Sequence, residues 1–404
     1  MQNYTHVKGG VTASAGFAAC GVEAGVRSAG RKDLALIVAE EPCPVAAVYT
    51  TNKIVAAPVI VSRKRTASGV AQAVVINSGN ANACTGGEGL SNACTMTRLA
   101  ATALGIEEDC TLVCSTGVIG VELPMEKVAS GIEKAAAALS ADGGHDAACA
   151  IMTTDTVEKE SAVEFEIDGR KIVIGGMAKG SGMIEPDMAT MLAFITTDAA
   201  IETSALDYAL KQAVGISFNR LVVDGDRSTN DTVMAFASGK AGNDIVTIAH
   251  PSFAVFVDAL KCVCIELGRK IVMDGEGATK FVTVRVTGAL SDEDAGMAAR
   301  AVARSPLVKT AFYGMDPNWG RIIAAVGYSG AEVEELKTVI TIGSTPVFDC
   351  GTVADQAMLE AACNEMKSRV FDVTVNLNLG DSSDTVYTCD FSHEYVSINA
   401  EYTT

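Results

Sequence analysis

The sequence predicts a layered α/β fold of the α+β kind, in which sheets are sandwiched with helices. Short apolar runs typical of strands recur along the whole chain, and amphipathic segments typical of helices lie between some of them. Hydrophobic residues make up 49% of the 404 residues and charged residues 20%, so the chain can bury a large core. Mixed strands and helices around such a core indicate layers of both kinds, although periodicity does not define the order of the strands.

The predicted strands are short runs rich in β-branched and other apolar residues. They cover residues 34–39, 73–77, 171–175, 191–197, 281–286, 338–342 and 373–377. A last strand is predicted over residues 384–399, because Val386, Thr388 and Asp390 alternate. This end of the chain is either an edge strand that simply stops or a terminus packed at a site, and composition alone favours the former.

The predicted helices lie at residues 124–139, 204–216, 292–303 and 356–366. In the first of them, Met125, Val128, Ile132 and Leu139 fall on one face. Pro124 suits the first turn, where the absent N–H would have no partner within the helix.

Charge and cysteine content limit the classes of function. Lys and Arg total 31 against 49 Asp and Glu, and the resulting net charge of −18 disfavours a nucleic-acid partner. The 12 cysteines form no CxxC pair and the four histidines have no metal-ligand spacing, so we expect reduced thiols and no metal site. The N-terminus lacks the pattern of a signal peptide, and no stretch approaches the roughly 20 apolar residues of a membrane span. We therefore expect a cytoplasmic protein without a membrane partner.

The densest candidate for chemistry is the glycine-rich run at residues 175–182 and the segment that follows it. Glycine costs backbone entropy in a buried strand or helix, so we expect a tight turn here or a backbone that approaches a ligand. Lys179 precedes Gly180 and Ser181 instead of closing a GxxxxGK[ST] loop, which excludes a nucleotide P-loop.

Thr190 stands where this segment enters an apolar run. A threonine hydroxyl is a poor nucleophile unless a base lies next to it. Cleavage of the chain between Ala189 and Thr190 would provide that base, since a new α-amine has a pKa of about 8. Threonine is also a common strand residue, so the pattern alone leaves an ordinary strand start open.

Other polar, glycine-containing segments follow predicted strands. Residues 114–120 either aim hydroxyl or N–H donors at an oxyanion or form an ordinary turn ahead of the next helix. The amides of residues 77–83 could orient a substrate. Glu276 lies between glycines, where its carboxylate could pair with a substrate ammonium group. Residues 224–232 are similar to part of a calcium loop but lack the glutamate at the last ligand position, so no EF-hand is predicted.

Taken in order, these segments are similar to those of the ornithine acetyltransferase (glutamate N-acetyltransferase) family of arginine biosynthesis. The blocks that carry the resemblance are residues 77–83, 115–120, 152–156, 179–194, 224–232, 274–280 and 316–321. The resemblance implies an N-terminal-nucleophile-like acetyltransferase fold and a precursor that cuts itself between Ala189 and Thr190. The products would be an α chain of residues 1–189 and a β chain of residues 190–404, assembled as a heterotetramer of two chains of each kind.

The resemblance also implies the chemistry. Thr190 would attack the acetyl carbonyl of N2-acetylornithine, release ornithine and pass the acetyl group to glutamate by a ping-pong mechanism. Thr116 and Gly117 would be the oxyanion donors. The residues that would bind substrate, besides Thr190, are Thr153, Lys179, Glu276, Asn399 and Thr404, with Thr154 beside them. Glu276 would face the amino group of the substrate. The chain terminus would be packed at the site, in contrast to the edge strand that composition alone favours.

The acetyl donor and the class of reaction each keep an alternative. Some members of the family use only acetylornithine, whereas others also accept acetyl-CoA, and no motif here separates the two kinds. We favour the bifunctional kind, with acetyl-CoA as a co-substrate and no bound cofactor. The alternatives to an acetyltransferase are an N-terminal-nucleophile aminopeptidase or amidase, which would use water as the acceptor, and a non-enzymatic small-molecule binding protein, which would need no cleavage.

Overall fold

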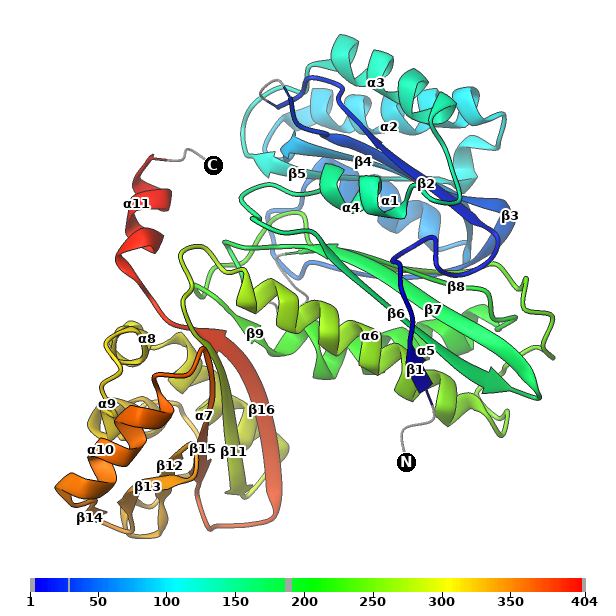
Figure 1. The fold of residues 1–404 in the computed structure, drawn as a ribbon. Helices are drawn as coiled ribbons and strands as arrows, with labels where there is room; N and C mark the ends of the chain where they lie inside the picture. The colour runs from blue at the N-terminus through cyan, green and yellow to red at the C-terminus, as the bar shows by residue number, and fades with distance from the viewer. Residues whose placement is uncertain (1–3, 28–29, 186–190, 402–404) are drawn as a thin grey trace.

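The computed structural model describes residues 4–27, 30–185 and 191–401. The predicted cleavage site at Ala189 and Thr190 and the predicted substrate ligand Thr404 lie outside the described residues. Two lobes are visible in Figure 1, each built around one sheet, and the C-terminal helix stands above the second lobe and beside the first.

The sheet of the first lobe has nine strands among the described residues. Their order is β1 (Tyr4–His6), β6 (Lys159–Ile167), β7 (Arg170–Lys179), β8 (Leu192–Thr197), β10 (Thr232–Ala237), β3 (Leu34–Tyr49), β4 (Val70–Asn80) and β5 (Thr111–Val118), with β2 (Phe17–Val22) also paired to β3. The long strand β3 pairs with β2 and β4 mainly through its first half and with β10 through its second half. This strand therefore joins two sheet layers, which pack against each other through a shared apolar core.

Helices cover both outer faces of this doubled sheet (Figure 1). Helices α1 (Ala57–Thr66), α2 (Gly86–Leu104) and α3 (Met125–Ala137) bury their apolar sides against β2 to β5. Helices α5 (Thr203–Ile216) and α6 (Phe253–Met273) cover the layer of β6, β7, β8 and β10, and the short helix α4 (Gly144–Ala150) contacts β2. The first lobe is thus a four-layer sandwich of helices, sheet, sheet and helices.

The second lobe has a seven-stranded sheet among the described residues. Its order is β14 (Thr352–Val353), β13 (Thr345–Asp349), β12 (Val339–Ile342), β15 (Val370–Asn376), β11 (Phe281–Ala289), β16 (Ser382–Cys389) and β9 (Leu221–Val222). The helices of this lobe are α7 (Asp292–Arg304), α8 (Pro306–Tyr313), α9 (Trp319–Gly327) and α10 (Gln356–Glu365). Because β9 leaves the first lobe to pair with β16, the two lobes are connected by strand pairing as well as by the chain.

The predicted layered fold with both strands and helices is confirmed. The predicted strand over residues 384–399 is wrong in its second half, where β16 ends at Cys389 and helix α11 (His393–Glu401) follows. The Asp390 carboxylate turns the chain by accepting hydrogen bonds of 2.8 Å from the backbone N–H groups of Thr279 and Lys280. Within the part of the chain that is described, no helix is both long and apolar enough to cross a membrane.

Candidate functional site

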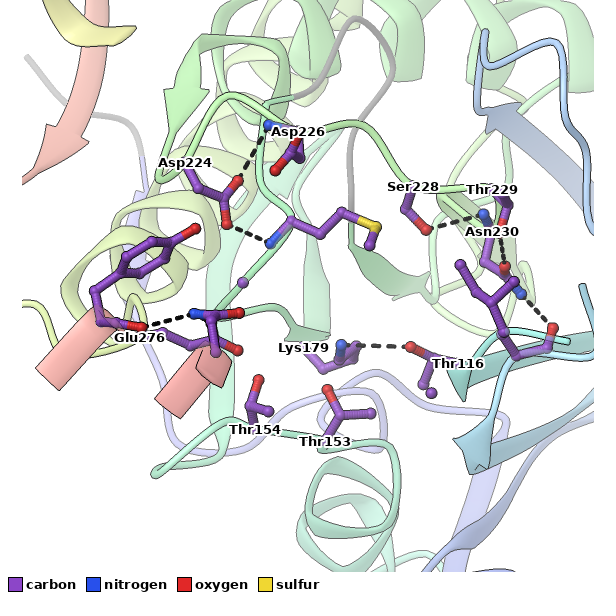
Figure 2. A pocket seen from close by; sticks show the side chains of 17 residues that line it. Thr116, Thr153, Thr154, Lys179, Asp224, Asp226, Ser228, Thr229, Asn230 and Glu276 are labelled. Atoms are coloured by element: carbon purple, nitrogen blue, oxygen red, sulfur yellow. Dashed lines mark hydrogen bonds between the residues drawn. The ribbon is translucent and has the colours of Figure 1, made fainter. Parts of the chain in front are cut away.

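A small cavity of about 200 Å³ lies where the ends of first-lobe strands meet helix α11 (Figure 2). The residues that line it are Ala81, Thr116, Gly117, Ile119, Thr153, Thr154, Lys179, Gly182, Met183, Asp224, Asp226, Ser228, Thr229, Asn230, Glu276, Tyr395 and Asn399. The predicted oxyanion and substrate-binding residues within the described part of the chain, which are Thr116, Gly117, Thr153, Thr154, Lys179, Glu276 and Asn399, are all in this set. Segments far apart in the sequence therefore converge on one pocket; the role of each residue in it stays a prediction.

Thr116 and Gly117 lie at the end of β5, beside Gly79 in β4. Gly117 has a φ of +133°, and a Cβ atom built on it would lie 2.3 Å from the carbonyl carbon of Gly79. A side chain at this position would be strained and would also collide with the neighbouring strand. Glycine is therefore required for the backbone to form this corner of the pocket.

Buried amides hold the end of β5 in place. Asn230 Nδ2 donates to the carbonyl oxygens of Ser115 at 2.8 Å and Ala81 at 2.6 Å, and Ser115 Oγ donates to Asn77 Oδ1 at 2.6 Å. The side chains of Asn77 and Asn82 likewise donate to backbone carbonyl groups inside the protein. The asparagine-rich segment 77–83 thus braces the site, and it lines the pocket only through Ala81.

Lys179 is the last residue of β7, and its ammonium group points toward Thr116 (Figure 2). Lys179 Nζ lies 3.4 Å from Thr116 Oγ1 and 4.0 Å from the carboxylate of Asp155. Burial lowers the pKa of Lys179; the charge of Asp155 opposes this shift, and the second ammonium group of Lys159 adds to it. A buried cation with only a distant counter-ion is suited to bind a substrate carboxylate or carbonyl oxygen.

A buried ionic network lies directly behind Lys179. Lys159 is fully buried, and its Nζ lies 2.7 Å from Asp155 Oδ1 and 2.6 Å from Asp274 Oδ2. Asp155 also accepts hydrogen bonds from the backbone N–H groups of Gly180 at 2.7 Å and Thr153 at 2.9 Å. Burial alone would raise the pKa of Asp155, but the positive charges of Lys179 and Lys159 lower this pKa well below its ordinary value. Lys159 belongs to no motif in the sequence, so its place beside the pocket is not predicted from it.

Glu276 stands across the pocket from Lys179 and is only 7% exposed. Its Oε2 accepts a 2.8 Å hydrogen bond from Asn399 Nδ2 of helix α11. A Cβ atom on Gly182 would lie 2.5 Å from the Glu276 carboxyl group, so glycine here allows the backbone to approach this carboxylate closely. The interaction with Asn399 connects the C-terminal helix to the pocket.

Gly175 and Gly176 both lie inside strand β7, so the expectation of a tight turn or a bound ligand is wrong at this end of the glycine-rich run, and the strand predicted over residues 171–175 continues to Lys179. A Cβ atom on Gly175 would lie 2.1 Å from the backbone oxygen of Gly10, and one on Gly176 would lie 2.7 Å from the side chain of Ile195. These two glycines therefore allow tight packing of a buried strand rather than a turn.

The segment at residues 224–230 forms a further wall of the pocket; it belongs to one of the blocks that carry the resemblance, but no site residue is predicted in it. The Asp224 carboxylate accepts hydrogen bonds from the backbone N–H groups of Met183 at 2.6 Å and Ile184 at 2.8 Å. Burial raises the pKa of Asp224 above its ordinary value. These contacts hold the chain in place as far as Glu185, the last residue described before Thr190.

The pocket has the charge pattern of a site for an amino acid. One end carries the ammonium group of Lys179, and the other carries the carboxylates of Glu276, Asp224 and Asp226. A molecule with both a carboxylate and an ammonium group can pair with both ends. Within residues 4–27, 30–185 and 191–401, no group of three or more His, Cys, Asp and Glu side chains is placed to hold a metal ion.

Comparison with known proteins gives a consistent result. Residues 18–404 match the ArgJ family. The arginine biosynthesis bifunctional protein ArgJ of Symbiobacterium thermophilum is 50% identical over 400 residues, which is 98% of this chain and 99% of that protein. The protein of the same name from Geobacter sulfurreducens is 50% identical over 389 residues, covering 96% and 99% of the two chains. The crystal structure of ornithine acetyltransferase complexed with ornithine from Mycobacterium tuberculosis is 39% identical, covers 46% of this chain and 98% of that one, and has a TM-score of 0.43.

Proposed function

The chain belongs to the ArgJ family, and on that premise we propose that it is an acetyltransferase of arginine biosynthesis that moves the acetyl group of N2-acetylornithine to glutamate. The observation that carries this proposal is the pocket, in which Lys179 and Glu276 lie at opposite ends. N2-acetylornithine has a carboxylate at one end and a free ammonium group at the other, and glutamate is also a small amino acid. Because its relatives are named as bifunctional, we extend the proposal to acetylation of glutamate from acetyl-CoA.

In the proposed mechanism, the α-amine of Thr190 removes the proton of the Thr190 hydroxyl as its Oγ attacks the acetyl carbonyl. The charge that develops on the carbonyl oxygen is stabilised by Thr116 and the backbone N–H of Gly117. The C–N bond of the amide then breaks, ornithine leaves with the proton from the α-amine, and the acetyl group stays on Thr190. The neutral amine of glutamate attacks this ester and forms the new amide, the bond between the acetyl carbon and Thr190 Oγ breaks, and the α-amine of Thr190 takes the proton of the attacking amine and returns it to Oγ.

Self-cleavage between Ala189 and Thr190 is the step that would create the free α-amine. It would give an α chain of residues 1–189 and a β chain of residues 190–404, assembled in the cytoplasm as a heterotetramer of two chains of each kind. A cleavage site close to the pocket is supported by the described residues before and after it. Both Ile184 and Met191 pack close to Gly180, the residue after Lys179. Substrate binding by Thr404, at the end of the chain, is part of the same proposal.

The amidase and the non-enzymatic binding protein that the sequence left open find no support in these relatives. Acetyl transfer to glutamate therefore stands as the proposed reaction. Its acceptor is an amine, whereas an amidase would transfer the same acetyl group to water.

The experiment that tests the proposal is the intact mass of the purified protein as denatured chains, followed by an assay with acetylornithine and glutamate. We expect two fragments that meet at Ala189 and Thr190, and formation of ornithine and N-acetylglutamate. Release of free acetate that glutamate does not suppress would favour the amidase. A single uncut chain without transfer activity would contradict both the nucleophile and the reaction.

A further inference from the structure

The pocket that holds Lys179 and Glu276 is too small for every substrate of the proposed function. Its volume of about 200 Å³ suits an amino acid and lies below the roughly 300–1,000 Å³ of pockets that enclose larger ligands. Coenzyme A is a group carrier with a long pantetheine arm and a nucleotide that bears several phosphate groups. When its acetyl group reaches Thr116, the nucleotide must therefore lie outside this pocket.

A second cavity, of about 710 Å³, adjoins the pocket and shares the residues Thr153 and Thr154 with it. We refer to it as the basic cavity, and the residues that matter here are Arg27, Arg31, Lys32, Met152 and Ile398. Helix α11 contributes to both spaces, with Asn399 in the pocket and Ile398 in the basic cavity. A ligand that passes along Thr153 and Thr154 would extend from one space into the other.

The charge of the basic cavity is opposite to that of the protein as a whole. The chain has a net charge of −18, yet three cations line this cavity against the carboxylates of Asp155 and Glu158. Asp155 is buried and lies between two ammonium groups, those of Lys159 at 2.7 Å and Lys179 at 4.0 Å, which compensate its charge. Local basic charge of this kind attracts phosphate groups even on an acidic protein.

The cations of the basic cavity are placed for different tasks. The guanidinium group of Arg27 donates to the backbone oxygens of Met152 at 2.6 Å and Thr153 at 2.7 Å, which fixes the ridge between the two spaces. Lys32 forms an ion pair with Asp146. Arg31 is exposed and makes no ion pair with any residue that the structure describes, so its guanidinium group is available for bidentate contact with a phosphate.

We propose that the basic cavity binds the nucleotide and phosphate groups of acetyl-CoA, with Arg31 and Lys32 as phosphate ligands and with the pantetheine arm laid across Thr153 and Thr154 into the pocket. This site rests on the proposed function, because it locates the second acetyl donor. It also separates the two donors in space, since acetylornithine needs only the pocket.

The test is charge reversal in the basic cavity, by Arg31→Glu and separately by Lys32→Glu. The matched control is Arg170→Glu, which makes the same charge change at an exposed site at the opposite end of β7 from Lys179. Calorimetric titration with CoA and with pantetheine, which lacks the nucleotide, measures binding without catalysis. Initial rates with acetyl-CoA and with acetylornithine measure the use of each donor.

We expect Arg31→Glu to weaken CoA binding about tenfold or more, to leave the affinity for pantetheine as in the unmodified protein, and to lower kcat/KM for acetyl-CoA at least tenfold more than for acetylornithine. The control should bind CoA like the unmodified protein. Equal losses with both donors, or CoA binding that both reversals leave unchanged, would overturn the site.

The two proposals fail in different ways. A protein that exchanges acetyl groups between acetylornithine and glutamate but does not bind CoA contradicts the basic cavity and leaves the exchange reaction in place. A protein that binds CoA through Arg31 but performs no exchange contradicts the proposed function and leaves the nucleotide site in place.

Discussion

Lys159 is the residue whose replacement tests the electrostatics of the site most directly. In Lys159→Met, a side chain of similar length removes the ammonium group that lies within 2.7 Å of both Asp155 and Asp274. All three groups are buried, so the variant leaves two carboxylates in the interior without their shared counter-ion. Removing one partner of a buried ion pair costs about 3–5 kcal/mol of the free energy of unfolding. We expect a loss in that range.

The same replacement should change the titration of Lys179. Lys159 is one of the charges that lower the pKa of Lys179, and it also competes with Lys179 for Asp155. Without it, the pKa of Lys179 rises. If the ammonium form of Lys179 binds substrate, activity falls as the pH rises through this pKa. The alkaline limb of the profile of kcat/KM against pH should therefore lie below the ordinary lysine value in the unmodified protein and move to higher pH in Lys159→Met.

The assay combines denaturant unfolding with a pH profile of acetyl transfer. Lys171→Met is the matched control, because Lys171 lies on the exposed part of β7 and pairs with Glu164 of the neighbouring strand β6. This variant should change neither the free energy of unfolding nor the pH profile appreciably. If Lys159→Met is too unstable for kinetics, adding Asp155→Asn should recover part of the stability, since one uncompensated charge is then removed. A Lys159→Met protein with unchanged stability and an unmoved alkaline limb would refute the reasoning.

Other predictions concern the nucleophile, the oxyanion corner and the C-terminal helix. Thr190→Ala should leave a single uncut chain without transferase activity, and normal cleavage in the mass spectrum would dismiss Thr190 as nucleophile. Gly117→Ala should lower kcat by about 10²-fold or more in a folded protein, because its Cβ would collide with Gly79; near-normal rates would show that this backbone N–H is not an oxyanion donor. Asn399→Ala removes the hydrogen bond to Glu276 and should raise KM for acetylornithine about tenfold. An unchanged KM would show that this contact of α11 does not contribute to substrate binding.

Local patterns and the resemblance predicted different parts of this structure. Periodicity located strands such as β4 and β11 and helix α3, because their apolar residues follow a strand or helix repeat. It missed α6, the 21-residue helix behind the site, since a helix with apolar residues on most sides shows no clear repeat. It also extended β16 through residues that form α11, where the turn depends on contacts of Asp390 with a distant loop.

The candidate site shows the same division. Thr153, Lys179, Glu276 and Asn399 were named because they match motifs, and the pocket brings them together. Lys159 matches no motif, and its partner Asp274 is 115 residues away, so only the folded chain reveals their interaction. Buried networks of this kind depend on tertiary contacts that a single sequence does not display.

The strand order predicts how the two proposed chains behave after cleavage. In the first-lobe sheet, β8 and β10, which belong to residues 190–404, lie between β7 and β3, which belong to residues 1–189. β8 pairs with β7 along its whole length, and β10 pairs with β3 over Val45 to Tyr49.

Separating the chains would therefore open a continuous sheet on two sides and expose its apolar core, at a cost typical of unfolding rather than of dissociation. We expect both fragments to coelute on size exclusion under native conditions at any practical dilution, and to separate only in denaturant. Because the pocket takes Thr116 and Lys179 from one fragment and Glu276 and Asn399 from the other, activity should be lost together with coelution. Fragments that separate in buffer, or one that retains transferase activity alone, would contradict a single sheet shared by the two chains.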